Sequence, residues 1–406
     1  MGDDRIQVTL GRRMNSMDLN AIRERHPRPD MIREDDLLLD GEWSFAFDDE
    51  GCGIRQHWER GCFQDLHTIR VPFAYQCAMS GMGPTDEIHP ILWYKRTFAL
   101  PEKMLNRRVI LRFLAVDDTC RVYVNGQYAG GHEGGYTPFG MEITNLLREG
   151  DNELCVMVRD DPDVTQPRGK QYWERGVMGC WYTPVSGIWQ SVYLETVGQV
   201  AIEKVHITPD LDQLRCNMEI VLDAMPEKDS TLEVDITFKG ECIRSLSVNA
   251  ERRVIHLPVD LRDRFGHVRT WHPDHPDLYD VQVTLKEKED VQDRVVTYFG
   301  LRKIEVSDGK IYLNHERIYL RMVLDQGYWP DSLLTPPNGQ AIHDDVILTK
   351  KLGYNGVRKH QKIEDPRYYY YADREGLMVW GELPSAYDFS REEVRRLAHT
   401  MEEFID

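Results

Sequence analysis

The stretch Lys351-Leu352-Gly353-Tyr354-Asn355-Gly356-Val357-Arg358-Lys359-His360 joins the end of a predicted helix to a predicted strand, and it decides the fold of the C-terminal region. Apolar residues before it recur at i,i+4 spacing, which is typical of a helix, and Gly353 ends that helix. Further along, the Asp365-Pro366 pair opens another helix. The uninterrupted apolar run at 377–380 predicts a strand that is buried on both faces.

These signals alternate between strand and helix. The predicted order is strand 317–323, helix 342–352, strand 354–358, helix 365–376, strand 377–380 and a helix that begins with the capping box Ser390–Glu393. Three strand–helix units in succession predict a parallel sheet or a barrel.

Upstream of Leu301 the pattern is entirely β. Trp43, Phe45 and Phe47 alternate with smaller or polar residues, as in a half-buried strand. Asn125-Gly126 between two short strands is a strong hairpin signal. A second run of short strands covers about 200–297, a length that suits an immunoglobulin-like sandwich. The region therefore predicts two β-sandwiches, preceded by a polar arm (1–35) that we expect to lie over the first of them.

Composition excludes several classes of protein. The chain has 406 residues with 50 basic and 68 acidic side chains, a net charge of -18, which argues against a nucleic-acid partner. The sequence has neither an apolar signal region at its start nor an apolar run long enough to span a membrane, so we expect a cytoplasmic protein without a membrane partner. The eight cysteines form no C-x-x-C pair and the histidines show no metal-ligand spacing, so no cofactor is expected.

Two sets of motifs carry a family resemblance. Ser186-Gly187-Ile188-Trp189-Gln190 resembles a stretch in the sugar-binding domain of glycoside hydrolase family 2. The segments 299–304, 320–321, 351–360 and 373–382 resemble, in order and spacing, the entry into the catalytic barrel of that family. The resemblance implies an arm (1–35), a jelly-roll sugar-binding-like domain (36–198), an immunoglobulin-like sandwich (199–300) and the first three units of a (β/α)8 TIM barrel (301–406).

Polar side chains follow each predicted barrel strand, where the active sites of such barrels lie. They form the predicted substrate-binding set: Asp325, Gln326, Trp329, Arg358, His360, Gln361 and Glu382. In the family, the arginine that matches Arg358 supports the nucleophile. The family often has a histidine three residues after this arginine, where Gln361 stands here. The alternative interpretation is a structural ion pair between Arg358 and Glu382. Trp329 could stack on a sugar ring or simply pack.

The resemblance implies a retaining β-glycosidase with two catalytic carboxylates about 5–5.5 Å apart. Neither is identified in this sequence, since the expected Asn-Glu pair does not occur after Leu301. A complete barrel takes about 250 residues, and 104 follow Arg302. We therefore expect both carboxylates beyond Asp406 and an inactive chain. Magnesium-using members have an acidic residue and a histidine shortly after the residue that matches Glu382, where Ala386 and Asp388 stand here, so no metal is predicted.

Two alternatives remain open, a non-catalytic carbohydrate-binding protein and a structural module. The expected inner barrel face, including Val357 and Val379, would be uncovered, so self-association into a homo-oligomer is a further expectation.

Overall fold

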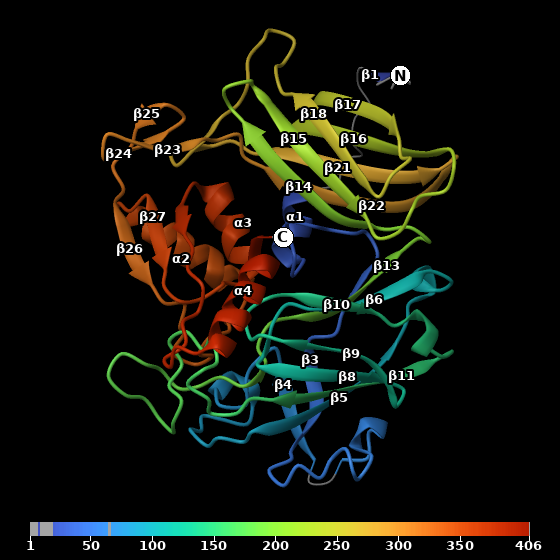
Figure 1. Ribbon diagram of the computed structural model, residues 1–406, viewed down its shortest axis with the longest axis vertical. Coiled ribbons are helices and arrows are strands. Elements are labelled where there is room, and N and C mark those ends of the chain that lie inside the picture. Colours follow the sequence, from blue (N-terminus) through green and yellow to red (C-terminus); the bar gives the residue numbers. More distant parts are fainter. Residues whose placement is uncertain (1–6, 9–18, 64–65, 406) are drawn as a thin grey trace.

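The computed structural model describes residues 7–8, 19–63 and 66–405, and these form three parts (Figure 1). Two β-sandwiches lie at opposite ends of the molecule, and a smaller α/β part lies beside the region where they meet. No helix in the described ranges is long and apolar enough to cross a membrane.

The first sandwich packs a six-stranded sheet, in the order β4-β3-β5-β11-β8-β9, against a four-stranded sheet, in the order β10-β6-β13-β2. Its strands are β2 (Asp36–Leu38), β3 (Gly41–Phe47), β4 (His67–Val71), β5 (Ile91–Ala99), β6 (Arg108–Phe113), β7 (Val116–Asp117), β8 (Thr119–Val124), β9 (Gln127–Glu133), β10 (Phe139–Glu142), β11 (Asp151–Arg159), β12 (Gly187–Ile188) and β13 (Val192–Val197). Short 3-10 helices lie at Trp58–Arg60, Ala78–Ser80, Glu102–Met104 and Thr144–Leu146. Alternating apolar residues fill the space between the sheets, so the predicted sandwich is confirmed.

The Ser186–Gln190 motif has a structural explanation in this sandwich. The Ser186 hydroxyl donates to a carboxylate oxygen of Asp160 at 2.5 Å. Gly187 has a φ of +96°, and a Cβ there would collide with the Tyr94 hydroxyl. The indole of Trp189 donates to the Gly135 carbonyl at 2.7 Å. These contacts therefore hold the backbone of the motif in place at the end of the first sandwich that lies nearest the α/β part.

The second sandwich packs a five-stranded sheet, in the order β1-β17-β16-β21-β22, against a three-stranded sheet, in the order β14-β15-β18. Its strands are β1 (Gln7–Val8), β14 (Ile202–Asp210), β15 (Arg215–Leu222), β16 (Ser230–Phe238), β17 (Glu241–Asn249), β18 (Val254–Asp260), β21 (Tyr279–Glu287) and β22 (Asp290–Phe299), with a small hairpin of β19 (Trp271–His272) and β20 (His275–Pro276). Its core is separate from that of the first sandwich.

The expectation that the arm lies over the first sandwich is only partly right, since β1 pairs with β17 of the second sandwich and residues 19–35 contact both sandwiches. The arm forms helix α1 (Leu19–Arg25), which the polar composition did not predict. Arg23 donates to Asp280 at 2.5 Å and to the Thr297 carbonyl at 2.9 Å, both in the second sandwich. Arg33 lies between Glu195 of β13 and Asp293 of β22, at 2.9 and 3.0 Å. Buried ion pairs therefore join the arm to both sandwiches.

The α/β part contains a three-stranded parallel sheet in the order β26-β27-β28. A three-stranded antiparallel sheet precedes it. The elements are β23 (Ile304–Ser307), β24 (Lys310–Leu313), β25 (Glu316–Arg317), β26 (Met322–Asp325), α2 (Gly339–Lys351), β27 (Gly356–Lys359), α3 (Pro366–Glu375), β28 (Met378–Trp380) and α4 (Arg391–Ile405). The first parallel strand begins later than the predicted 317–323, because Glu316 and Arg317 pair with β24 in a hairpin.

Helices α2 and α3 cover one face of the parallel sheet. Val323, Val357 and Val379 pack there with buried residues of both helices. The expectation that Val357 and Val379 face the barrel interior is therefore wrong, because both side chains point toward the helices. Side chains alternate along a strand. The face of the sheet away from the helices therefore carries the register partners Leu324, Arg358 and Trp380. Leu324 and Trp380 are 53% and 57% exposed, so this face is open.

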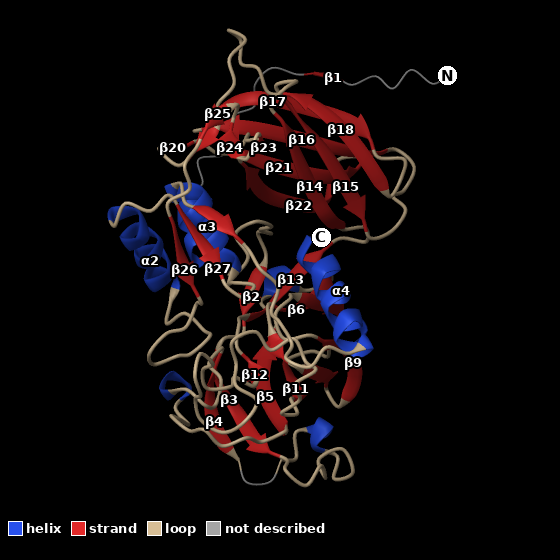
Figure 2. Ribbon diagram, turned by 60° about the vertical axis from the view of Figure 1, so that its left-hand side comes forward, coloured by secondary structure: helices blue, strands red, loops and turns tan. Residues whose placement is uncertain are grey.

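Helix α4 does not cover the open face of the sheet. Figure 2 shows it against the first sandwich, close to β9. Arg395 and Arg396 pair with Glu133 of β9 at 2.6 and 3.0 Å, and Arg396 also reaches Asp118 at 3.1 Å. The Ser390 hydroxyl accepts the backbone N–H of Glu393, which confirms the capping signal. This helix therefore joins the α/β part to the first sandwich.

Candidate functional site

The candidate site lies at the carboxyl edge of the parallel sheet. In the β26–β27 pair Asp325 is opposite Lys359, and in the β27–β28 pair Arg358 is opposite Trp380. Because the strands are parallel, the residues that follow them emerge at the same edge. Packing with the first sandwich supports this edge, since Leu334 and Ile363 bury against Tyr136 and Trp189.

Glu382 is the centre of the site. Its Oε1 accepts the Nε–H of Arg358, its Oε2 lies 2.7 Å from His360 Nδ1, and the backbone N–H of Gln361 donates to Oε2 at 3.2 Å. Burial alone would raise the pKa of Glu382, but the hydrogen bonds from Arg358 and His360 outweigh it and hold the pKa below its usual range. We refer to Arg358, His360 and Glu382 as the Glu382 cluster.

The Glu382 cluster remains accessible. The Arg358 side chain is 49% exposed and the Glu382 side chain 22% exposed. A half-exposed guanidinium keeps donors free for a second carboxylate, and a partly exposed carboxylate can accept from a hydroxyl. The cluster therefore combines the predicted ion pair with the ability to bind a polar ligand.

Asp325 lies beside the Glu382 cluster in a separate network. Its carboxylate receives Lys359 Nζ at 2.6 Å, the backbone N–H of Gly327 at 2.8 Å and the Tyr368 hydroxyl at 3.4 Å. Lys359 is 2% exposed and also pairs with Glu364 at 2.9 Å. Both oxygens of Asp325 thus have partners in the protein, which favours a supporting role over direct contact with a ligand.

A loop of the first sandwich contacts the other two polar residues of the edge. The Tyr182 hydroxyl donates to the side-chain carbonyl of Gln326. The Tyr387 hydroxyl bonds the Gln361 side chain at 3.1 Å and also donates to the Gly169 carbonyl. Gln326 and Gln361 therefore connect the sheet edge to the 160–186 segment.

Aromatic rings gather where this loop meets Tyr387. Trp173 and Trp181 lie 5.0 and 5.4 Å from the Tyr387 ring, and 5.2 Å from each other. Lys170 Nζ lies 5.6 Å from the Trp181 ring. Tyr387, Tyr182 and Lys170 were absent from the predicted set, although the aromatic density of residues 172–182 was a usable signal.

Trp329 is not brought into the Glu382 cluster. Its backbone forms a bridge with Leu333, with N–O distances of 2.8 and 3.0 Å. The ring is half-buried. Of the seven predicted residues, the structure thus joins Arg358, His360, Gln361 and Glu382 directly, places Asp325 and Gln326 alongside, and leaves Trp329 apart.

The chain matches two models of one protein family. Residues 37–197 match the model described as glycosyl hydrolases family 2, sugar binding domain. Residues 200–302 match the model described as glycosyl hydrolases family 2. The chain belongs to glycosyl hydrolase family 2.

Curated relatives support this membership. A protein of Formosa agariphila, provisionally named a β-glucuronidase, is 30% identical over 300 residues, covering 72% of this chain and 35% of its own length. A β-galactosidase of Thermoanaerobacter pseudethanolicus is 25% identical over 358 residues, covering 86% of this chain and 46% of its own length. The chain thus spans less than half the length of these relatives.

Among solved structures, β-glucuronidase from Ruminococcus gnavus in complex with D-glucuronic acid is similar, with a TM-score of 0.76. The match covers 93% of this chain and 64% of that chain at 20% sequence identity. The likeness shows that the fold is shared.

Proposed function

We propose that this chain is the N-terminal portion of an exo-acting family 2 β-glycosidase, and that the Glu382 cluster is one wall of its substrate site. The observation that carries the proposal is the convergence of Arg358, His360 and Glu382 at one sheet edge. In barrel enzymes, ligands bind at this edge of the strands.

We further propose that β26, β27 and β28 are the first three strands of a (β/α)8 barrel. A parallel sheet is stable when both faces are covered. Here the helices cover one face, while Leu324 and Trp380 are exposed on the other. Additional strands would close the sheet and enclose the open face. The relatives support this proposal, because more than half of their length lies outside the match.

In the proposed reaction, a retaining mechanism needs two carboxylates about 5–5.5 Å apart, one as nucleophile and one as acid/base. We assign neither to a residue of this chain and place both in the remaining barrel strands. Arg358 would position the nucleophile through its exposed guanidinium. Glu382, held by Arg358 and His360, would accept a hydrogen bond from a sugar hydroxyl. The ring cluster of Trp173, Trp181 and Tyr387 would border the sugar.

The test compares two polypeptides on nitrophenyl β-galactoside, β-glucuronide and β-mannoside. The 406-residue chain should release no nitrophenol above background, whereas a polypeptide that contains it with the remaining barrel strands should turn over one of these substrates. Turnover by the 406-residue chain that is abolished by mutation of one of its own residues would contradict the assignment of the carboxylates. Sugar binding without turnover by the longer polypeptide would support the non-catalytic alternative.

A further inference from the structure

A group of three potential metal ligands lies where α4 meets the first sandwich, on a different element from the Glu382 cluster. His132 is on β9, and His399 and Glu403 are on α4. His132 Nε2 lies 3.0 Å from Glu403 Oε1, and His399 Nε2 lies 3.3 Å from the same oxygen. Among the described residues, this is the only group of three His, Cys, Asp or Glu side chains whose ligand atoms all lie within 4.8 Å of one another.

The geometry of these three atoms fits a small tetrahedral cation. Zn²⁺ binds histidine nitrogen and carboxylate oxygen at about 2.0–2.2 Å, which places neighbouring ligands about 3.3 Å apart in a tetrahedron. The two separations from Glu403 Oε1, 3.0 and 3.3 Å, are close to that value, and all three ligand atoms lie within 4.8 Å of one another. Two imidazole nitrogens and one carboxylate oxygen are also the donor types that Zn²⁺ prefers.

The surrounding contacts orient the ligands. The hydroxyl of Thr137 donates to Glu403 Oε2 at 2.5 Å, which leaves Oε1 facing the two histidines. The ring of His132 stacks on Phe139 with a centroid distance of 4.2 Å and an interplanar angle of 7°. His399 and Glu403 are spaced i,i+4, so they share one face of α4. The hydrogen bond from Thr137 is an outer contact of the kind that holds carboxylate ligands in place in known metal sites.

One carboxylate oxygen, Glu403 Oε1, faces two ring nitrogens here, and two N–H donors or one shared cation would both fit this arrangement. Direct hydrogen bonds would require an N–H on both rings. A cation between the three atoms would instead use the lone pairs of both neutral imidazoles and of the carboxylate. We propose that His132, His399 and Glu403 bind a zinc-class divalent cation that fastens α4 to the first sandwich.

The site is open to solvent on one side. His399 is 45% exposed, so an ion can enter. His399 and Glu403 also line a cavity of about 420 Å³ together with Arg28, Arg112, Pro138 and Glu402. A cation with three protein ligands keeps a fourth position for water or for a small anion in this cavity.

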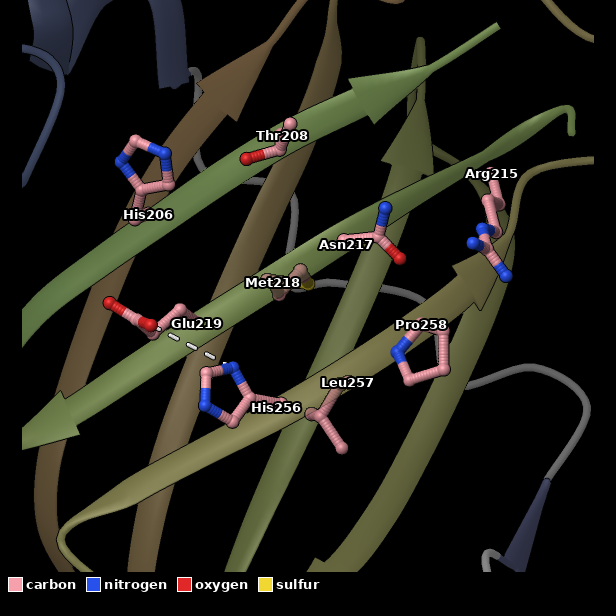
Figure 3. A pocket seen from close by; sticks show the side chains of 9 residues that line it. All are labelled: His206, Thr208, Arg215, Asn217, Met218, Glu219, His256, Leu257 and Pro258. Carbon is pink, nitrogen blue, oxygen red and sulfur yellow. Dashed lines mark ion pairs between the residues drawn. The ribbon is translucent and has the colours of Figure 1, made fainter. Parts of the chain in front are cut away.

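The second sandwich provides a matched contrast. Figure 3 shows His206, Glu219 and His256 on the outer face of the three-stranded sheet. His256 Nδ1 lies 3.7 Å from Glu219, and the ligand atoms of these three side chains do not all lie within 4.8 Å of one another. His256 is therefore the control residue, an exposed histidine beside a single carboxylate.

The experiment titrates the full chain, free of any histidine tag, with Zn²⁺ in competition with a chromogenic chelator. One equivalent of Zn²⁺ should bind. His399→Ala and Glu403→Gln should each weaken binding by about 100-fold, since even outer contacts of metal ligands change affinity by 10–100-fold. His256→Ala should bind as the parent does. Co²⁺ should give visible d–d absorption in the parent chain that His399→Ala loses.

Hydrogen exchange gives an independent readout. Added Zn²⁺ should increase the protection of residues 391–405 in the parent and leave His399→Ala unchanged. The proposal would be overturned by the absence of Zn²⁺ binding, or by binding that persists unchanged in both His399→Ala and Glu403→Gln. Both substitutions are at partly exposed side chains, so thermal unfolding should show that the variants remain folded.

Discussion

The two β-sandwiches and the α/β part differ in how completely they cover their apolar residues. In the first sandwich Leu111 and Leu154 are fully buried between two sheets of the same unit. In the α/β part Val357 is 1% exposed beneath the helices, whereas Leu324 and Trp380 on the other face are more than half exposed. The sandwiches are thus complete units, while the parallel sheet still presents apolar surface that favours association.

This contrast separates stability from function. The residues that determine stability lie in the sandwich cores and in the buried ion pairs. The polar residues that we assign to the substrate lie on the incompletely covered sheet. The four predictions that follow probe this difference, from the largest expected effect to the smallest.

The buried ion pairs of Arg33 should matter most. Arg33→Ala would leave Glu195 and Asp293, each 2% exposed, without their shared partner. Removal of one member of a buried charge network typically costs about 3–5 kcal/mol. Urea unfolding should show a loss of this size, and Arg33→Lys, which keeps the charge, should lose less. Equal stability of Arg33→Ala and the parent would show that the ion pairs of Arg33 do not stabilise the contact between the two sandwiches.

Within the α/β part, Glu364 should give a pH-dependent effect. Burial alone would raise its pKa, but the ammonium groups of Lys359 and Lys362 outweigh this and lower the pKa from 4.5 to about 2. A lowered folded-state pKa gives stability that is present above pH 4.5 and is lost as the pH falls toward 2.

Glu364→Gln should therefore destabilise the α/β part near neutral pH. The difference between this variant and the parent should shrink as the pH falls from 4.5 to 2. This difference in stability can be measured by hydrogen exchange of residues 356–376, corrected for intrinsic exchange rates. Residues 279–299 of the second sandwich serve as the internal reference. A difference that is independent of pH would mean that the charge of Glu364 is not what stabilises this part.

The same substitution in the two regions tests the contrast directly. Leu111→Ala removes a fully buried side chain from the first sandwich and should cost about 2–5 kcal/mol. Leu324→Ala removes a side chain that is 53% exposed on the open face and should change stability by less than about 0.5 kcal/mol. Urea unfolding of both variants measures the two losses in the free energy of unfolding. Similar losses would show that the open face of the parallel sheet is covered in solution.

The loss of a helix cap should cost less than the loss of a buried core side chain. The Asn338 side chain accepts the backbone N–H of Ala341 at 2.9 Å at the start of α2. Asn338→Ala should cost about 1 kcal/mol, visible as faster hydrogen exchange in the first turn of α2. Asn338→Asp keeps the acceptor and should retain protection. Loss of protection in Asn338→Asp as well would point to a cause other than the cap.

Much of the fold could be predicted from the sequence because local signals agreed with tertiary packing. Gly353 ends α2 within two residues, and Asp365 caps α3 through the backbone N–H of Arg367. The Asn125-Gly126 hairpin joins β8 to β9. Where local and tertiary preferences differed, the prediction was less accurate. Helix α1 forms in a polar segment because the Arg23 side chain bonds to the second sandwich. No sequence pattern indicates a partner so distant along the chain.

The candidate site was predictable where parallel strands set the geometry. Arg358, His360 and Glu382 follow neighbouring strands, so their meeting follows from topology. The contributions of Tyr182 and Tyr387 could not be predicted in the same way, because they depend on the path of the 160–186 loop across a domain boundary. Similarly, His132 is 267 residues from His399, and only the docking of α4 brings them together.

The most direct test of the Glu382 cluster is kcat/KM for an active polypeptide that contains this chain. Glu382→Gln should lower kcat/KM on the order of 100-fold, because the site loses the carboxylate that would accept the sugar hydroxyl and that holds Arg358 in place. The matched control is Glu305→Gln, because Glu305 likewise pairs with one basic side chain and one histidine, Lys303 at 2.9 Å and His315 at 3.1 Å, but lies in β23. We expect a large loss for Glu382→Gln alone. Unchanged kcat/KM in a folded Glu382→Gln variant would contradict this expectation and would leave the cluster a structural ion pair.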